Sequence, residues 1–236
     1  MFRSLIVYWR PGRQNNLRKF YAPFMSEGDL VFDVGSHLGD RSLAFASLGA
    51  KVISMEPQPL VNLWQQWMIG HHPKIILRKE AVGSASGVGH LSISDLTPTV
   101  STIAESWKEK IVIVNPTFRK VRWNQKVKVD IITLDELIVL YGVPTYCKID
   151  VEGYEGKVLQ GLSHPIKLVS FEFIYGDLES TISCVELLET LGVYEFNIVI
   201  GENRKFQFSE WVDKELLLDH LSTNQSSSGD LYAKLM

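Results

Sequence analysis

The stretch from Leu30 to Gly39, which reads LVFDVGSHLG, constrains the fold of this chain more than any other. Its first half is an apolar run, typical of a buried strand, and it is followed by Gly35, Gly39 and a helix-like segment. A glycine turn between a strand and a helix lets the backbone approach a ligand closely, and the helix start directs free N–H groups towards that ligand. The stretch therefore predicts a nucleotide-type site at the end of a parallel strand.

The acid at position 33 narrows the choice of ligand. A dinucleotide-binding turn has glycine where this chain has Asp33, because the backbone there lies against a pyrophosphate. A carboxylate would repel those phosphates, so Asp33 favours a ligand that carries a cationic group and no nearby phosphate. S-adenosylmethionine, with its α-ammonium and sulfonium groups, fits. The structural alternative is that Asp and Gly are simply common turn formers.

Two further strand ends extend the predicted site. Lys51 to Met55 alternates like a strand and ends in Glu56 and Pro57, where an acid is placed to accept the two ribose hydroxyls. A short third strand, Lys74 to Leu77, leads to three residues that we expect at the adenine rim: Glu80, Ala81 and Val82. Glu80 has an equal alternative as a solvated loop acid.

Composition limits the class of protein. The 236 residues suit one α/β domain, 27–236, behind an N-terminal helical extension, 1–26. The net charge of −3 provides no general attraction to nucleic acid or to an anionic membrane. The apolar run Leu5 to Trp9 is too short for a membrane span, and Cys147 and Cys184 lack metal-site spacing, so we expect a cytoplasmic protein.

The order of the elements predicts the architecture. Strands alternate with helices along most of the chain, which favours a doubly wound, mostly parallel sheet with an antiparallel finish. Residues 97–125 show no persistent period and predict a long irregular connection, either a functional loop or a partly disordered one. Its basic run suits a solvated face, with the binding of an anionic substrate group as the alternative. Near the end we expect a hairpin of Tyr194 to Ile200 with Lys205 to Phe208, and a last helix from Ser209 to about Leu221.

A second group of charged residues follows the strand Thr145 to Val151. Lys148 and Asp150 share one face of that strand by its period of two, and Glu152 follows at once. Glu172 ends another strand, so the topology brings these acids to the same sheet edge as Asp33 and Glu56. Lys148 needs a carboxylate partner in so apolar a strand. The acids are candidates for a general base or for holding a hard cation such as Mg²⁺, although they equally suit sugar hydroxyls or the neutralisation of Lys148.

These residues resemble the FkbM-type S-adenosylmethionine-dependent methyltransferases from about Tyr21 to Phe173, with a similar ending at Gly229 to Lys234. The strings that carry the resemblance are DLVFDVGSHLG from Asp29, MEP from Met55, EAVG from Glu80 and, most specific of all, KIDVEGYE from Lys148. The resemblance implies a class I methyltransferase fold, Rossmann-like, with a seven-stranded sheet in a three-layer sandwich. It also implies methylation of a hydroxyl on a sugar or other natural product. His37 and Ser84 depart from the family pattern.

The sequence thus predicts an S-adenosylmethionine-dependent O-methyltransferase that acts on a small-molecule or saccharide acceptor. It predicts no nucleic-acid partner and no membrane span, and a homo-oligomer is compatible with it. The predicted cofactor-binding residues are Asp33, Gly35, Ser36, His37, Gly39, Glu56, Pro57, Glu80, Ala81 and Val82. The predicted catalytic residues are Asp150, Glu152, Glu172 and Lys148, and none is assigned as a metal ligand. The alternatives are a nicotinamide-dependent oxidoreductase and a non-catalytic adenosyl-binding or scaffold domain.

Overall fold

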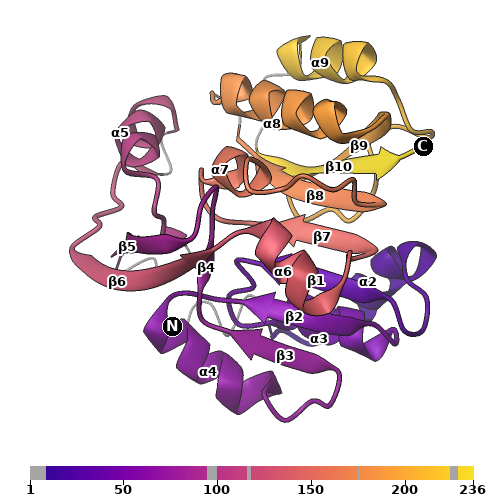
Figure 1. The fold of residues 1–236 in the computed structure, drawn as a ribbon. Coiled ribbons are helices and arrows are strands. Elements are labelled where there is room, and N and C mark those ends of the chain that lie inside the picture. Colours follow the sequence, from indigo (N-terminus) through magenta and orange to yellow (C-terminus); the bar gives the residue numbers. More distant parts are fainter. Residues whose placement is uncertain (1–8, 95–99, 116–117, 175, 224–227) are drawn as a thin grey trace.

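The central sheet has seven strands in the order β3-β2-β1-β7-β8-β10-β9 (Figure 1). It was described from a computed structural model that covers residues 9–94, 100–115, 118–174, 176–223 and 228–236. The strands are β1 Leu30–Val34, β2 Lys51–Met55, β3 Ile75–Arg78, β7 Tyr146–Ile149, β8 Leu168–Phe173, β9 Tyr194–Ile200 and β10 Gly229–Leu235. Only β10, the last in the chain, runs antiparallel to both of its neighbours. The predicted sheet, with its antiparallel last strand, is confirmed.

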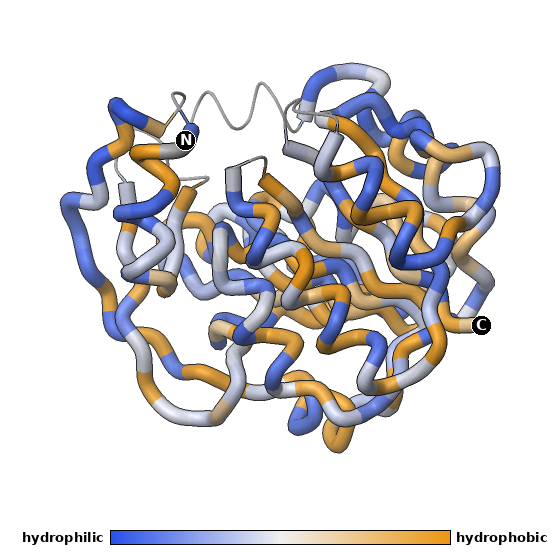
Figure 2. The backbone as a smooth tube through the Cα atoms, turned by 90° about the horizontal axis from the view of Figure 1, so that it is seen from above, coloured by the Kyte–Doolittle hydropathy of each residue, from blue (hydrophilic) through white to orange (hydrophobic). Residues whose placement is uncertain are grey.

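Helices cover both faces of this sheet and make three layers. On one face lie α2 Arg13–Tyr21, the 3₁₀ helix Ala22–Phe24, α3 Asp40–Ser47 and α4 Pro59–Ile69. On the other lie α6 Leu134–Tyr141, α7 Glu155–Leu159, α8 Leu178–Leu191 and α9 Lys214–Thr223. Apolar residues concentrate between the layers (Figure 2), where side chains such as Phe32 and Ile53 are fully buried because both sheet faces are covered. None of the helices in the described ranges has the length and apolarity that crossing a bilayer requires.

Local sequence signals explain several element ends. Thr133 and Glu136 form a capping box at the start of α6, and Gly142 ends that helix. Within the predicted helical extension, α2 ends at Tyr21 and the chain continues as the 3₁₀ turn. Cys147 and Cys184 are free and buried, as expected for small apolar side chains.

A second, smaller sheet stands at the carboxyl ends of the parallel strands (Figure 1). It contains β4 Ala81–Val82, β5 Gly87–Ile93 and β6 Gln125–Ile132, in the order β4-β6-β5. The sequence did not predict that these segments join in a separate sheet. Helix α5, Glu105–Val114, lies beside this sheet inside the connection that was predicted to be irregular, so that prediction is wrong for this segment. Residues 97–99 and 116–117 of the connection lie outside the described residues.

The C-terminal region differs from the prediction in two places. Beyond β9 the structure has no strand at Lys205 to Phe208 within the described residues; Phe206 makes only an isolated bridge to Val199. The last helix begins at Lys214, not at Ser209, and its cap is Asp213, whose carboxylate accepts a hydrogen bond from the backbone N–H of Leu216 at 2.9 Å. The intervening segment instead lies along β9, where Phe196 and Val212 exchange backbone hydrogen bonds.

Candidate active site

Two adjoining pockets lie at the carboxyl ends of β1, β2, β7 and β8. The first, called here the cofactor pocket, is lined by these residues: Asp33, Val34, Gly35, Ser36, His37, Arg41, Met55, Glu56, Pro57, Glu80, Ala81, Val82, Leu91, Ser101, Thr102, Ile103, Lys148, Asp150, Val151, Glu152 and Tyr154. It contains all of the predicted cofactor-binding residues except Gly39. Their meeting at one edge follows from parallel strands ending together.

Gly39 has another role. It begins α3 with φ +77, and a Cβ added there would come within 2.2 Å of Ile69 Cδ1 on α4. Its small size therefore serves the turn and the close approach of two helices. Gly39 does not line the cofactor pocket, and its contact with the cofactor stays a prediction.

Asp33 is almost fully enclosed by the protein, with 1% of its surface exposed. One carboxylate oxygen accepts a hydrogen bond from Ser42 Oγ at 2.5 Å. The hydroxyls of Ser36, Ser42 and Ser54 and the amide of Gln65 continue a buried hydrogen-bond network behind it. Burial raises the pKa of Asp33, although Lys148 and Ser42 act in the opposite direction. The network holds this carboxylate at the pocket wall in one orientation.

Glu56 joins two walls of the pocket. Its Oε2 accepts a hydrogen bond from the backbone N–H of His37 at 2.9 Å, and its Oε1 accepts one from the backbone N–H of Gln58 at 2.8 Å. Burial raises the pKa of Glu56 to about 7. Burial likewise lowers the pKa of His37 to about 4, so that its imidazole is neutral near pH 7. Glu80, at the far rim, is paired with Arg78, which lowers its pKa.

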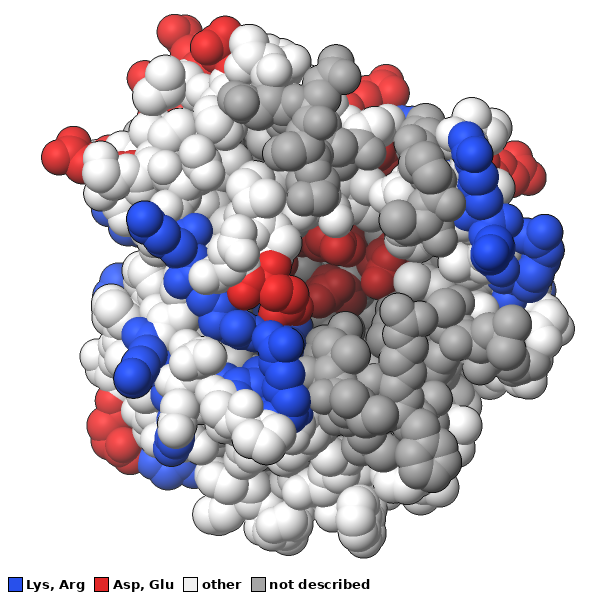
Figure 3. All heavy atoms as spheres, turned by 180° about the vertical axis from the view of Figure 1, so that it is seen from behind, with Lys and Arg blue, Asp and Glu red and all other residues white. Residues whose placement is uncertain are grey.

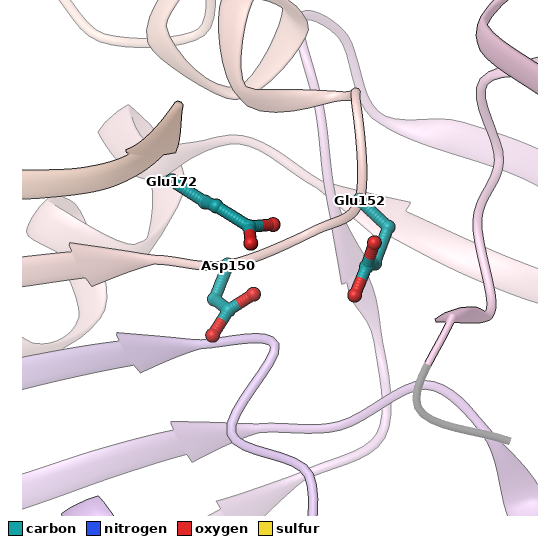
Figure 4. Close-up of side chains that lie close together, drawn as sticks. All are labelled: Asp150, Glu152 and Glu172. Carbon is teal, nitrogen blue, oxygen red and sulfur yellow. The ribbon is translucent and has the colours of Figure 1, made fainter. Parts of the chain in front are cut away.

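The predicted catalytic acids form a cluster (Figure 4), in which Asp150 and Glu152 line the cofactor pocket. Asp150, Glu152 and Glu172 each offer an oxygen within 4.8 Å of the others. Asp150 accepts a hydrogen bond from Lys148 Nζ at 2.7 Å, which confirms the predicted pairing of these two residues. Burial opposes ionisation of Asp150, but Lys148 and Arg41 hold its pKa below the ordinary value. Burial and the neighbouring carboxylates raise the pKa of Glu152 and of Glu172 well above theirs.

The second pocket, called here the acceptor groove, begins where the cofactor pocket ends. Ile103 and Tyr154 line both, while Glu172 lines the groove and not the cofactor pocket. The groove lies between α5, α7 and α8 and has a volume of about 690 Å³, within the range of small-molecule sites. Acidic side chains gather in a hollow of this molecule (Figure 3). Those that line the groove are Glu105, Glu155, Glu172, Asp177 and Glu179.

The connection between β5 and β6 forms part of both pockets. Ser101 accepts a hydrogen bond from Gln58 Nε2 at 2.9 Å, which ties the connection to the end of β2. Trp107 of α5 packs on Gly153, where an added Cβ would lie 2.1 Å from the indole. Sequence reasoning missed these wall residues because the segment shows no regular period; the pair Trp107 and Ile111, both buried and one helical turn apart, was the available signal.

Arg41 is a second residue that the sequence reasoning missed. It lies in the first turn of α3 and lines the cofactor pocket. An arginine in that position is usually taken for a solvated surface charge, but only 15% of this side chain is exposed. Its position directly after the glycine turn was the only sequence signal for it.

Comparison with known proteins places this geometry in a family. Similar solved structures include a precorrin-6y C5,15-methyltransferase from Geobacter metallireducens (10% identity, 95% of this chain and 87% of that one, TM-score 0.48). Another is a TehB-like S-adenosylmethionine-dependent methyltransferase from Corynebacterium glutamicum (11% identity, 100% of this chain and 94% of that one, TM-score 0.48). A third is a putative rRNA methylase from Clostridium thermocellum (10% identity, 94% of this chain and 95% of that one, TM-score 0.46). No curated protein matches the sequence. The family model described as the methyltransferase FkbM domain matches residues 33–220, which is most of the chain. This protein therefore belongs to the FkbM methyltransferase domain family, whose members are S-adenosylmethionine-dependent methyltransferases.

Proposed function

We propose that this enzyme methylates a hydroxyl group of a sugar or another polyhydroxylated natural product. The observation that carries the proposal is the position of the acid cluster Asp150, Glu152 and Glu172 at the junction of the cofactor pocket and the acceptor groove. An alcohol is a weak nucleophile near neutral pH and has to lose a proton during the reaction, so a positioned base is needed where the two substrates meet.

The cofactor pocket has the donors and acceptors that S-adenosylmethionine requires. Glu56 keeps unused lone pairs on both oxygens for ribose hydroxyls, and Asp33 presents an acid for the α-ammonium group. Ala81, Val82 and Leu91 supply an apolar wall for the adenine. When bound, the cofactor supplies a methyl group activated by its positively charged sulfur, and no covalent enzyme intermediate is needed.

The acid cluster divides into two kinds of carboxyl group. Asp150 is kept ionised by Lys148 and provides fixed negative charge. Burial and the neighbouring carboxylates raise the pKa values of Glu152 and Glu172, so the ionised form of each is a stronger proton acceptor than an ordinary carboxylate. In the proposed reaction, the acceptor hydroxyl gives its proton to one of these two glutamates. Deprotonation and methyl transfer leave the acceptor as a neutral ether.

The groove favours a neutral or cationic polyol over a nucleic acid. Its lining has five acids and one lysine, Lys157; the acids that are ionised would repel a phosphate backbone, whereas carboxylates accept hydrogen bonds from sugar hydroxyls. Trp107 and Phe171 add aromatic surface to the groove for the apolar faces of a sugar ring. A Mg²⁺ ion on the three cluster oxygens is the alternative to a protein base, because it would lower the pKa of a bound hydroxyl.

The test compares Asp150→Asn, Glu152→Gln and Glu172→Gln with wild type. We expect S-adenosylhomocysteine affinity within about threefold of wild type. Methyl transfer to a panel of methyl glycosides should fall about 10²-fold or more in the variant that lacks the base. Melting temperature, calorimetric affinity and product release are measured on the same preparations, with Mg²⁺ or with EDTA. Glu109→Gln, an exposed acid of α5 outside both pockets, is the matched control.

Normal turnover by all three variants would remove the acid cluster from the mechanism and leave it a structural role. Loss of activity in EDTA that Mg²⁺ restores would select the metal over the protein base. Transfer to an amine or a nucleic acid, with no transfer to any hydroxyl, would contradict the proposed acceptor class.

A further inference from the structure

Arg41 is a partly buried cation at the cofactor pocket, and no hydrogen bond of its guanidinium is seen among the described residues. Its guanidinium lies 3.8 Å from a carboxylate oxygen of Glu202 and 3.9 Å from one of Asp230, distances of ion pairs and not of hydrogen bonds. Its Nε is buried and has no hydrogen-bond partner among the described residues. Buried polar groups without partners are rare in folded proteins, and a charged donor is expensive to leave in that state.

The other cations near the pocket are already engaged. Lys148 donates to Asp150 at 2.7 Å, and Arg78, behind the rim, is bound to Glu80 and donates to Tyr141 Oη at 2.9 Å. Arg41 is the pocket-lining cation for which the structure shows no hydrogen bond within the described residues. It is thus available to an acceptor that enters from the pocket.

The environment of Arg41 indicates which chemical group it would hold. It lies one residue into α3, where backbone N–H groups of the first turn add positive potential and Gly39 provides no side-chain cap. A planar guanidinium matches a carboxylate with two parallel hydrogen bonds. We propose that Arg41 binds the α-carboxylate of the methionine part of S-adenosylmethionine. The inference rests on the proposed function, and Asp33 would take the neighbouring α-ammonium.

The competing explanation is that Arg41 only balances Glu202 and Asp230. Arg204 provides a matched control, because its side chain is 14% exposed, close to the 15% of Arg41, and it also pairs with Glu202, at 2.7 Å. Arg204 lines a small cavity with Arg41 but does not line the cofactor pocket. Arg204→Gln therefore removes a cation from the same charge cluster without touching the proposed subsite.

The experiment measures the affinity of S-adenosylhomocysteine and of 5′-methylthioadenosine by calorimetry for wild type, Arg41→Gln, Arg41→Lys and Arg204→Gln. The second ligand keeps the adenosyl thioether and lacks the amino-acid group. Arg41→Gln should weaken S-adenosylhomocysteine about tenfold or more and change 5′-methylthioadenosine by less than about twofold. Arg41→Lys, which keeps the charge beside Glu202 and Asp230, should show a smaller loss with the same selectivity, and Arg204→Gln should show none.

Other results would overturn the inference. Equal losses for both ligands in the Arg41 variants would mean a distorted pocket, and unchanged S-adenosylhomocysteine affinity would make Arg41 a counter-ion only. If wild type binds neither ligand, the cofactor assignment itself is wrong. That outcome is distinct from a wild type that binds S-adenosylhomocysteine and an Arg41→Gln variant that binds it equally well.

Discussion

At the scale of single residues, Glu56 is a carboxylate whose orientation is fixed by hydrogen bonds from the backbone. Two backbone N–H groups, from His37 on one side and Gln58 on the other, fix both carboxylate oxygens. Only 7% of the residue is exposed, and burial brings its pKa to about 7. The restraint orients the carboxylate for ribose hydroxyls, while burial makes its ionisation depend on pH in the physiological range.

This shift predicts a pH-dependent contribution to stability. Between pH 4.5 and 7 the unfolded chain has lost the Glu56 proton while the folded protein keeps it, so the unfolded state binds fewer protons and stability falls as pH rises. Across that window wild type should lose up to about 3 kcal/mol relative to Glu56→Gln. Chemical denaturation of both proteins at pH 5, 6 and 7 measures the difference. Glu80→Gln should leave this slope unchanged, because Arg78 lowers the pKa of Glu80. A difference in the free energy of unfolding between wild type and Glu56→Gln that stays constant from pH 5 to pH 7 would contradict the raised pKa of Glu56.

At the scale of elements, the parts that could be predicted are those with a local signal. The apolar strands end in acids at Asp33, Glu56 and Asp150, and parallel pairing then requires these acids to meet. The sequence of α5 carries no comparable signal: Trp107 and Ile111 point into a small cluster, whereas Ile113 on the same helix is 77% exposed. Its position depends on tertiary contacts with the turn at Gly153. The pairing of the two-residue strand β4 likewise depends on β6 and could not be found locally.

The contact between the ends of β1 and β7 yields a prediction of its own. Gly35 has φ +75, and a Cβ added there would lie 1.8 Å from the backbone oxygen of Asp150. The sequence predicted that glycine here lets the backbone approach a ligand closely; the structure places the missing Cβ against the neighbouring strand end. Gly35→Ala should therefore both destabilise the fold and displace Asp150.

Gly28→Ala is the control for backbone conformation, since Gly28 has φ +86 and open space around it. Both variants bear the strain of a positive φ, about 1 kcal/mol, and Gly35→Ala should cost at least about 1 kcal/mol more in the free energy of unfolding. Methyl transfer should fall in Gly35→Ala alone. If Gly35→Ala and Gly28→Ala lose the same free energy of unfolding and have the same activity, the ends of β1 and β7 can move apart without cost.

At the scale of the whole molecule, the site is assembled between two sheets. The large sheet supplies the acids and the glycine turn, and the small sheet with its connection supplies Ser101, Thr102 and Ile103. The sequence predicted pocket residues at the strand ends. It did not predict the pocket residues of the connection, because that segment shows no regular period. The same connection then continues through α5 into the acceptor groove.

That continuous wall has a consequence for the order in which ligands bind. Ile103 and Tyr154 line both pockets. A ligand that orders these two side chains in one pocket therefore also lowers the entropy cost of binding in the other. We expect ordered addition, with the cofactor first, and a saturating methyl glycoside acceptor should tighten S-adenosylhomocysteine binding about fivefold or more. Thermodynamic linkage requires the reverse measurement to give the same factor. Calorimetric titrations in both orders, together with product-inhibition patterns, test this, and a factor of one would mean that the shared wall is rigid and the two pockets fill independently.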